Sequence, residues 1–147
     1  MFMEEVVWMA SSQSQEASAE SIREHYGIPN PRVIAKQFGK LDVYARRFIG
    51  LSPFDVIASS DRSGRCDSTP RGDAPGFVWV KDDCTLLIPD RPGNRRVDTM
   101  LNITANPFVG LLFMVPGINE TLRVNGSARF TEDERLMQPL SVNGSCR

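Results

Sequence analysis

Hydrophobic residues recur at helical spacing in the segment that follows Asn30-Pro31, and this pattern predicts a helix. One face carries Ile34, Phe38, Leu41, Ala45 and Phe48, at intervals of three and four residues. Asn30 suits the N-cap position and Pro31 the first helical position. Gly39 can divide this helix in two and Gly50 can end it. The apolar face is expected to pack against a sheet.

The region before this helix is mostly small and polar. Residues 1–20 are expected to form a flexible tail, because the stretch "SSQSQEASAE" contains few groups that could be buried. Ser21 and Glu24 form a possible capping box, and Gly27 suits a helix C-terminus. Residues 21–52 therefore form a predicted helical lead.

The pattern changes after Pro53 to short apolar or alternating runs separated by turns. Strands are predicted at residues 54–60, 65–69, 77–80, 85–88, 109–115 and 121–130, with helices at about 95–105 and after Thr131. The stretch "PRGDAPG" is predicted to be a loop. No alternation of strands with crossover helices appears. Residues 53–147 are therefore expected to form one mainly β domain, an antiparallel sheet closing toward a barrel with flanking helices.

Composition narrows the function. The chain has 147 residues and a formal net charge of −1, which gives no overall attraction to nucleic acid or to an anionic membrane. Three cysteines without metal-ligand spacing favour a reducing compartment over a disulfide framework. His25 is the single histidine, so no multi-histidine metal site is expected. The acidic N-terminus does not resemble a signal peptide, and no apolar run reaches transmembrane length. A cytoplasmic protein without nucleic-acid, membrane or metal partners is predicted.

A basic pair in the stretch "PDRPGNRRVD" is the first candidate for binding chemistry. Arg95 and Arg96 stand at the predicted start of a helix, where the helix dipole disfavours cations. One interpretation is that both are solvated or paired with Asp90 and Asp98, as surface arginines commonly are. The other is that a phosphate binds there, since guanidinium groups and free helix N–H groups both suit it. Asn94 would then be the N-cap and a hydrogen-bond donor.

The stretch "DSTPRGD" is the second candidate. Ser68, Thr69 and Arg71 could contact phosphate or ring oxygens, although a loop of this composition is also common without function. No nucleophile stands near a base, so no catalytic side chain is predicted.

Beyond these residues, the chain resembles the pyridoxamine 5′-phosphate oxidase-like flavoproteins, the FMN-binding split β-barrels. The resemblance is carried by "STPRGDAPGFV", "LLIPDRPGNRRVDTMLNITANPFVGLLFMVPG" and "ETLRVNGSAR". It implies an FMN whose phosphate is bound by Arg95 and Arg96, with Asn94 before them. It further implies cofactor contacts from Ser68, Thr69, Pro70, Arg71, Ile88 and Pro89, and from Glu120 or Thr121 of a partner subunit. A homodimer with FMN at its interface follows.

The resemblance also has gaps. The features that recognise pyridoxal phosphate in the oxidase are not evident, so the expected activity is that of an FMN-dependent oxidoreductase acting on an unknown small molecule. Members similar to this chain continue beyond "PLSVNG" with further barrel strands, which implies a C-terminally truncated member with an incomplete barrel. Two alternatives stay open. One is a non-catalytic module for flavin, deazaflavin or haem, and the other is a truncated remnant without cofactor.

Overall fold

The structure is a computed structural model that describes residues 18–31, 39–91, 96–137 and 140. It divides into two units, Met1–Gln37 and Phe38–Arg147. In the first unit, helix α1 (Ala19–Tyr26) begins after Ser18, whose hydroxyl accepts a hydrogen bond from the Ser21 N–H. The helix ends at Gly27 with φ of 67°, a conformation that glycine adopts without a steric penalty. The predicted stop is confirmed, whereas the N-cap is Ser18 and not Ser21.

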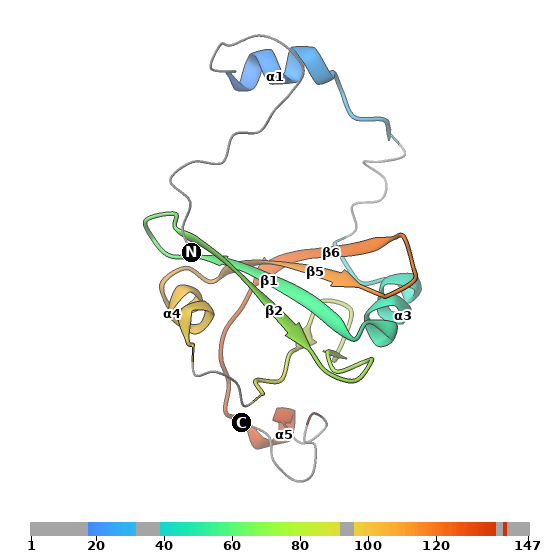
Figure 1. Ribbon diagram of the computed structural model, residues 1–147, viewed down its shortest axis with the longest axis vertical. Coiled ribbons are helices and arrows are strands. Elements are labelled where there is room, and N and C mark those ends of the chain that lie inside the picture. Colours follow the sequence, from blue (N-terminus) through green and yellow to red (C-terminus); the bar gives the residue numbers. More distant parts are fainter. Residues whose placement is uncertain (1–17, 32–38, 92–95, 138–139, 141–147) are drawn as a thin grey trace. The chain divides into compact units, whose positions relative to one another are not determined.

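The second unit is built on an antiparallel sheet of four strands (Figure 1). Its order is β2-β1-β5-β6, and a separate two-stranded sheet pairs β3 with β4. The strands are β1 (Phe54–Ser60), β2 (Cys66–Gly72), β3 (Trp79–Val80), β4 (Leu86–Leu87), β5 (Phe108–Met114) and β6 (Thr121–Ser127). The predicted fold class, mainly antiparallel β with flanking helices, is confirmed. Within the described residues the strands do not close into a barrel.

The core forms on one face of this sheet because side chains alternate along each strand. On β1, Asp55, Ile57 and Ser59 are buried. Ile57 pairs with Leu111 on β5, and Asp55 pairs with Phe113. Leu111 and Phe113 are buried and join Ile49, Phe77 and Val78 in a single hydrophobic cluster. A carboxylate therefore sits in a row of positions otherwise suited to apolar side chains.

Three helices lie in the described residues of this unit. Helix α3 (Val43–Leu51) begins after Asp42, whose carboxylate accepts a 2.7 Å hydrogen bond from the Ala45 N–H. Helix α4 (Asp98–Ala105) packs against β1 and β2, and α3 packs against β3 and β6 (Figure 1). Helix α5 (Glu134–Met137) is a single turn. Ile34 and Phe38 of the predicted apolar face lie outside the described residues.

Strand β2 is longer than predicted. The predicted loop beginning at Pro70 is wrong in its first part, because β2 runs through Pro70 to Gly72. In the described sheet β2 has a neighbour, β1, on one side only. An edge strand tolerates proline, since a missing N–H on the open side removes no ladder hydrogen bond. Strand β2 therefore carries residues 67–71 in extended conformation, which fixes the direction of their side chains.

Ser52 joins the end of α3 to the sheet. It is almost fully buried, and its Oγ lies 2.7 Å from the carbonyl oxygens of both Phe54 and Met114. Ser52→Ala should lower the free energy of unfolding by about 1 kcal/mol, because both carbonyls then lose their shared donor. Urea denaturation followed by circular dichroism measures this change. Ser127→Ala, at an exposed position on β6, is the control, and equal stability of the two variants would contradict the assignment.

Candidate ligand-binding site

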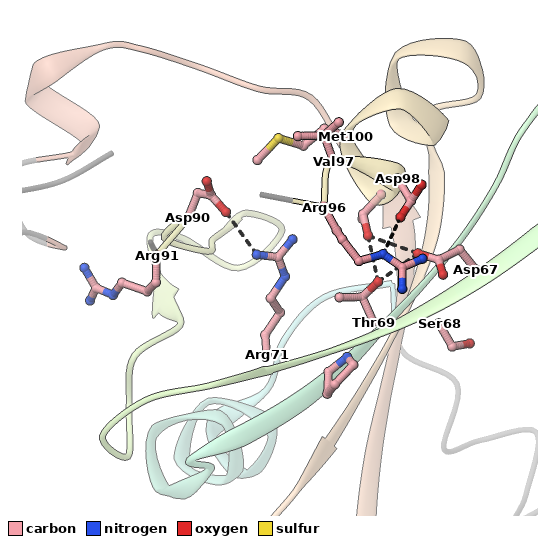
Figure 2. Close-up of a pocket in the computed structure, with 12 residues that line it drawn as sticks. Asp67, Ser68, Thr69, Arg71, Asp90, Arg91, Arg96, Val97, Asp98 and Met100 are labelled. Carbon is pink, nitrogen blue, oxygen red and sulfur yellow. Dashed lines mark hydrogen bonds and ion pairs between the residues drawn. The ribbon is translucent and has the colours of Figure 1, made fainter. Parts of the chain in front are cut away.

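A cavity of about 460 Å³ lies between β2 and the start of α4 (Figure 2). Residues 67–71 of β2, residues 90 and 91 after β4, and residues 96–100 at the start of α4 line it. We call this cavity the β2–α4 pocket. Its volume falls within the range of small-molecule sites, which is roughly 300–1,000 Å³.

The alternation of β2 decides which predicted residues face inward. Thr69 and Arg71 are half-buried, whereas Ser68 and Pro70 are exposed. In Figure 2 the Ser68 side chain lies on the opposite side of the strand from Thr69. All four residues border the pocket, but only Thr69 and Arg71 direct their side chains to its interior face.

Two threonines and a carboxylate connect β2 to α4 inside the pocket. The hydroxyls of Thr69 and Thr99 lie 2.8 Å apart. Thr69 Oγ1 lies 2.8 Å from Asp67 Oδ2, and Thr99 Oγ1 lies 3.3 Å from the same oxygen. Thr99 is buried, on the first turn of α4. This network holds the strand and the helix that form two walls of the pocket.

Three arginines contribute positive charge, each with a carboxylate partner. Arg71 Nη1 lies 3.0 Å from Asp90 Oδ1, Arg91 Nε lies 2.8 Å from Asp73 Oδ2, and Arg96 Nε lies 3.0 Å from Asp98 Oδ2. Figure 2 shows the Arg71 guanidinium directed from β2 toward Asp90. The Arg71 side chain is 23% exposed, and its Nε is buried without a hydrogen-bond partner in the described part of the chain. Its Nη1, paired with Asp90, is the atom that the structure places at the pocket, and a guanidinium there could bind an anion.

Helix α4 begins later than predicted. Its first residue is Asp98 and its N-cap is Val97, without a side-chain hydrogen bond. The predicted start near Arg95 is therefore wrong, and Arg96 precedes the helix. Asp98 occupies the first turn, where the helix dipole favours a carboxylate. Arg96 pairs with Asp98, which is one of the contacts that the first interpretation named. Asn94 and Arg95 lie outside the described residues.

The remaining predicted residues do not line the pocket. Ile88 is half-buried and packs against the core cluster, and Pro89 is buried immediately before Asp90. Glu120 and Thr121 are exposed, and Thr121 is the first residue of β6. Strands β6 and β2 form the two opposite edges of the described sheet. One chain therefore does not bring Glu120 or Thr121 to this pocket.

Asp55 is a residue near the pocket that the sequence analysis did not identify. It is fully buried on β1 directly opposite Arg71, and neither carboxylate oxygen has a hydrogen-bond partner of acceptable geometry among the described residues. Burial raises the pKa of Asp55 to about 6, although the charge of Arg71 and the residue's own backbone N–H act in the opposite direction. The available signal was its place in the alternation of β1, where a core-facing position carries a charge.

Arg91 was also missed, because its proline- and glycine-rich surroundings predict only a turn. Its guanidinium donates to Asp73 and to the Leu140 carbonyl. The Ala74 N–H and, after it, Arg91 hold the pKa of Asp73 below its ordinary value. Arg91 thus joins the pocket to segments distant in sequence.

No group of three or more His, Cys, Asp or Glu side chains in the described chain is arranged to hold a metal ion. Among the helices in the described segments, none has the length and hydrophobicity needed to cross a membrane.

Comparison with known proteins agrees with the fold. Among solved structures, a HupZ variant from Group A Streptococcus is similar, with a TM-score of 0.51 and 16% sequence identity, over 67% of this chain and 80% of that chain. A search of curated proteins gives no significant match. The family model described as pyridoxamine 5′-phosphate oxidase matches residues 41–144, which include strand β2 and helix α4 at the pocket. The chain therefore belongs to the pyridoxamine 5′-phosphate oxidase-like family.

Proposed function

We propose that this protein is an FMN-binding flavoprotein and an oxidoreductase of the pyridoxamine 5′-phosphate oxidase-like class, with its flavin phosphate in the β2–α4 pocket. Members of this family generally bind flavin or haem. The observation that carries the proposal is the gathering of Arg71, Arg91 and Arg96 around one cavity. The side chains of Arg71 and Arg91 are 23% and 26% exposed, so both guanidiniums are partly buried, which suits an anionic group.

Arg71 and Arg96 are the described residues proposed to hold the phosphate, together with Asn94 and Arg95. Guanidinium groups bind phosphate through paired, charge-assisted hydrogen bonds. Both arginines already pair with carboxylates, but partly exposed pairs of this kind contribute little stability. The free energy lost when a phosphate replaces Asp90 or Asp98 as the partner of its arginine is therefore small.

The remaining contacts are proposed from the family pattern. Ser68, Thr69 and Pro70 would contact the flavin along β2, and Ile88 and Pro89 would lie near its ring. Bound FMN would supply the electron transfer, while the chain supplies binding, orientation and shielding from water. No side chain is assigned a catalytic role, and the substrate is an unidentified small molecule.

A homodimer completes the proposed site. Family members often form dimers. Thr121 begins β6 at the far edge of the sheet and Glu120 directly precedes it, so a second copy would have to supply them to the pocket. Residues 53–147 are proposed as the cofactor domain, preceded by the tail at residues 1–20 and the helical lead at residues 21–52. We also propose a cytoplasmic location, because the thiols of Cys66 and Cys84 are free and the cytoplasm keeps thiols reduced.

Haem is the less favoured cofactor for this pocket. Haem iron takes histidine, cysteine, methionine or tyrosine as axial ligand. Of these types, the described lining residues include only Met100. Three guanidiniums suit a phosphate ester better than a single thioether suits an iron.

Titration of the protein with FMN, followed by quenching of flavin fluorescence, tests the proposal. We expect wild-type protein to bind FMN and Arg96→Gln to bind it about tenfold more weakly, as loss of one charged hydrogen bond implies. Riboflavin, which lacks the phosphate, should bind the two proteins equally. The riboflavin result separates a phosphate contact from a general loss of structure.

Arg47→Gln is the matched control, because Arg47 is exposed on α3 and does not line the pocket. It should bind FMN as wild type does. Failure of wild type to take up FMN, or equal affinities for Arg96→Gln and Arg47→Gln, would contradict the proposal. A Soret band in the purified protein would favour haem instead.

A further inference from the structure

The buried carboxylate of Asp55 lies behind the pocket, on the strand next to the one that carries Arg71. Asp55 and Arg71 are directly opposed in the β1–β2 register, on the inner face of the sheet. Both Asp55 oxygens and Arg71 Nε are buried without hydrogen-bond partners in the described part of the chain. Arg71 Nη1 reaches in the other direction to Asp90 at the pocket. One guanidinium therefore stands between a buried carboxylate and the cavity.

The other groups facing Asp55 leave Arg71 as its main source of compensating charge. On β2, Asp67 shares the inner face but is engaged with Thr69 and Thr99. On β5, the opposing residue is Phe113. Helix α4, which also packs on β1, carries one charged side chain, Asp98, paired with Arg96. Arg71 is the charged group whose field acts on Asp55.

From this geometry we infer that binding of a phosphate-type anion at Arg71 is linked to proton uptake by the Asp55 carboxylate. The inference rests on the proposed function in one respect, that the pocket receives an anion at Arg71. No covalent chemistry is involved: one proton leaves the solvent and binds an Asp55 oxygen.

The direction of the linkage follows from charge. Without ligand, Arg71 favours the ionised form of Asp55, and burial opposes it, so the pKa of Asp55 is about 6. A bound anion shares the Arg71 charge and adds negative charge nearby, which raises this pKa further. The complex then holds a proton that the free protein has lost. Anion affinity therefore falls as pH rises from about 6 to the higher pKa of the complex.

Isothermal titration calorimetry at pH 7 tests the linkage, with inorganic phosphate and FMN as separate probes in buffers of different ionisation enthalpy. The dependence of the heat on buffer gives the protons taken up per ligand bound. We expect Asp55→Asn to take up fewer protons than wild type with either probe. Protonation of the ligand itself is common to both proteins and cancels. Glu132→Gln, which removes an exposed carboxylate that does not line the pocket, should retain the wild-type proton count.

A second measurement needs no ligand. Carbon-13 NMR titration of the aspartate carboxyls should show a higher pKa for Asp55 in Arg71→Gln than in wild type, and recovery in Arg71→Lys. A merely structural role of Arg71 would not depend on its charge in this way.

The outcomes are distinguishable. Equal proton counts for Asp55→Asn and wild type, or an Asp55 pKa unaffected by Arg71→Gln, would overturn the inference while FMN binding stands. Phosphate binding with Asp55-dependent proton uptake but without FMN binding supports the inference and contradicts the proposed function alone. If wild type binds neither phosphate nor FMN, both the inference and the proposed function are overturned.

Discussion

Replacement of Phe113 by alanine is expected to lower the free energy of unfolding by about 4 kcal/mol, the typical cost of removing a buried aromatic ring. Phe113 is 0% exposed and lies on β5, a central strand of the sheet between β1 and β6. Its side chain belongs to the cluster that also holds Ile57 and Leu111. The cavity left behind would be surrounded by the other buried side chains of this cluster, which limits how far the surroundings can collapse. Urea denaturation monitored by circular dichroism gives the value.

Phe108→Ala supplies the matched control on the same strand. Phe108 is 71% exposed, so its loss should change stability by less than about 1 kcal/mol. Similar destabilisation by the two variants would show that the core is not centred on Phe113.

Asp55→Asn is expected to become progressively more stable relative to wild type as pH rises. The folded pKa of Asp55 is raised from 3.8 to about 6, so between these values the folded state holds a proton that the unfolded state has lost. Wild-type stability from this group is therefore greatest at low pH and falls as pH rises through that window. The amide cannot ionise and escapes this loss. The difference between variant and wild type should grow by about 2 kcal/mol from pH 4 to pH 8.

Denaturant titrations of both proteins at a series of pH values provide the measurement. Asp61→Asn is a control of opposite sign. Asp61 is in the β1–β2 turn, where hydrogen bonds, first from the Ser63 side chain, lower its pKa. Its contribution is present above pH 4 and is lost as pH falls, so Asp61→Asn should approach wild type in acid. If the stability difference between Asp55→Asn and wild type did not change with pH, folding would not raise the pKa of the Asp55 carboxyl.

Strands with strong alternation or continuous apolar runs were predictable from sequence. The predictions for β1 and β5 match in type and nearly in extent, because residues such as Ile57 and Leu111 occupy core positions that few other residues tolerate. Family membership was also predictable, since it depends on long consecutive motifs, and the family model confirms it. Local sequence patterns were sufficient to predict a strand wherever burial requires apolar side chains at alternate or consecutive positions.

Tertiary context decided the rest. Pro70 reads as a loop residue, yet it lies inside β2 because that strand is at an edge of the described sheet. Arg96 reads as a helix residue, yet α4 begins at Asp98. Strand pairing places Asp55 opposite Arg71, and nothing within either segment alone indicates that register. The roles of Asn94, Arg95, Glu120 and Thr121 in FMN binding stay predictions.

The pairing of each pocket arginine with a nearby aspartate has a consequence for how tightly any anion can be held. Asp90, Asp73 and Asp98 act as internal counterions for Arg71, Arg91 and Arg96. An arriving anion exchanges one counterion for another, and does not meet a bare cation. The binding free energy of the anion is therefore the difference between the free energy of its ion pair with the arginine and that of the arginine–aspartate pair it replaces. Because the aspartates belong to the same chain, they compete with the anion at a fixed effective concentration. The same exchange lets a ligand depart without leaving these guanidiniums uncompensated.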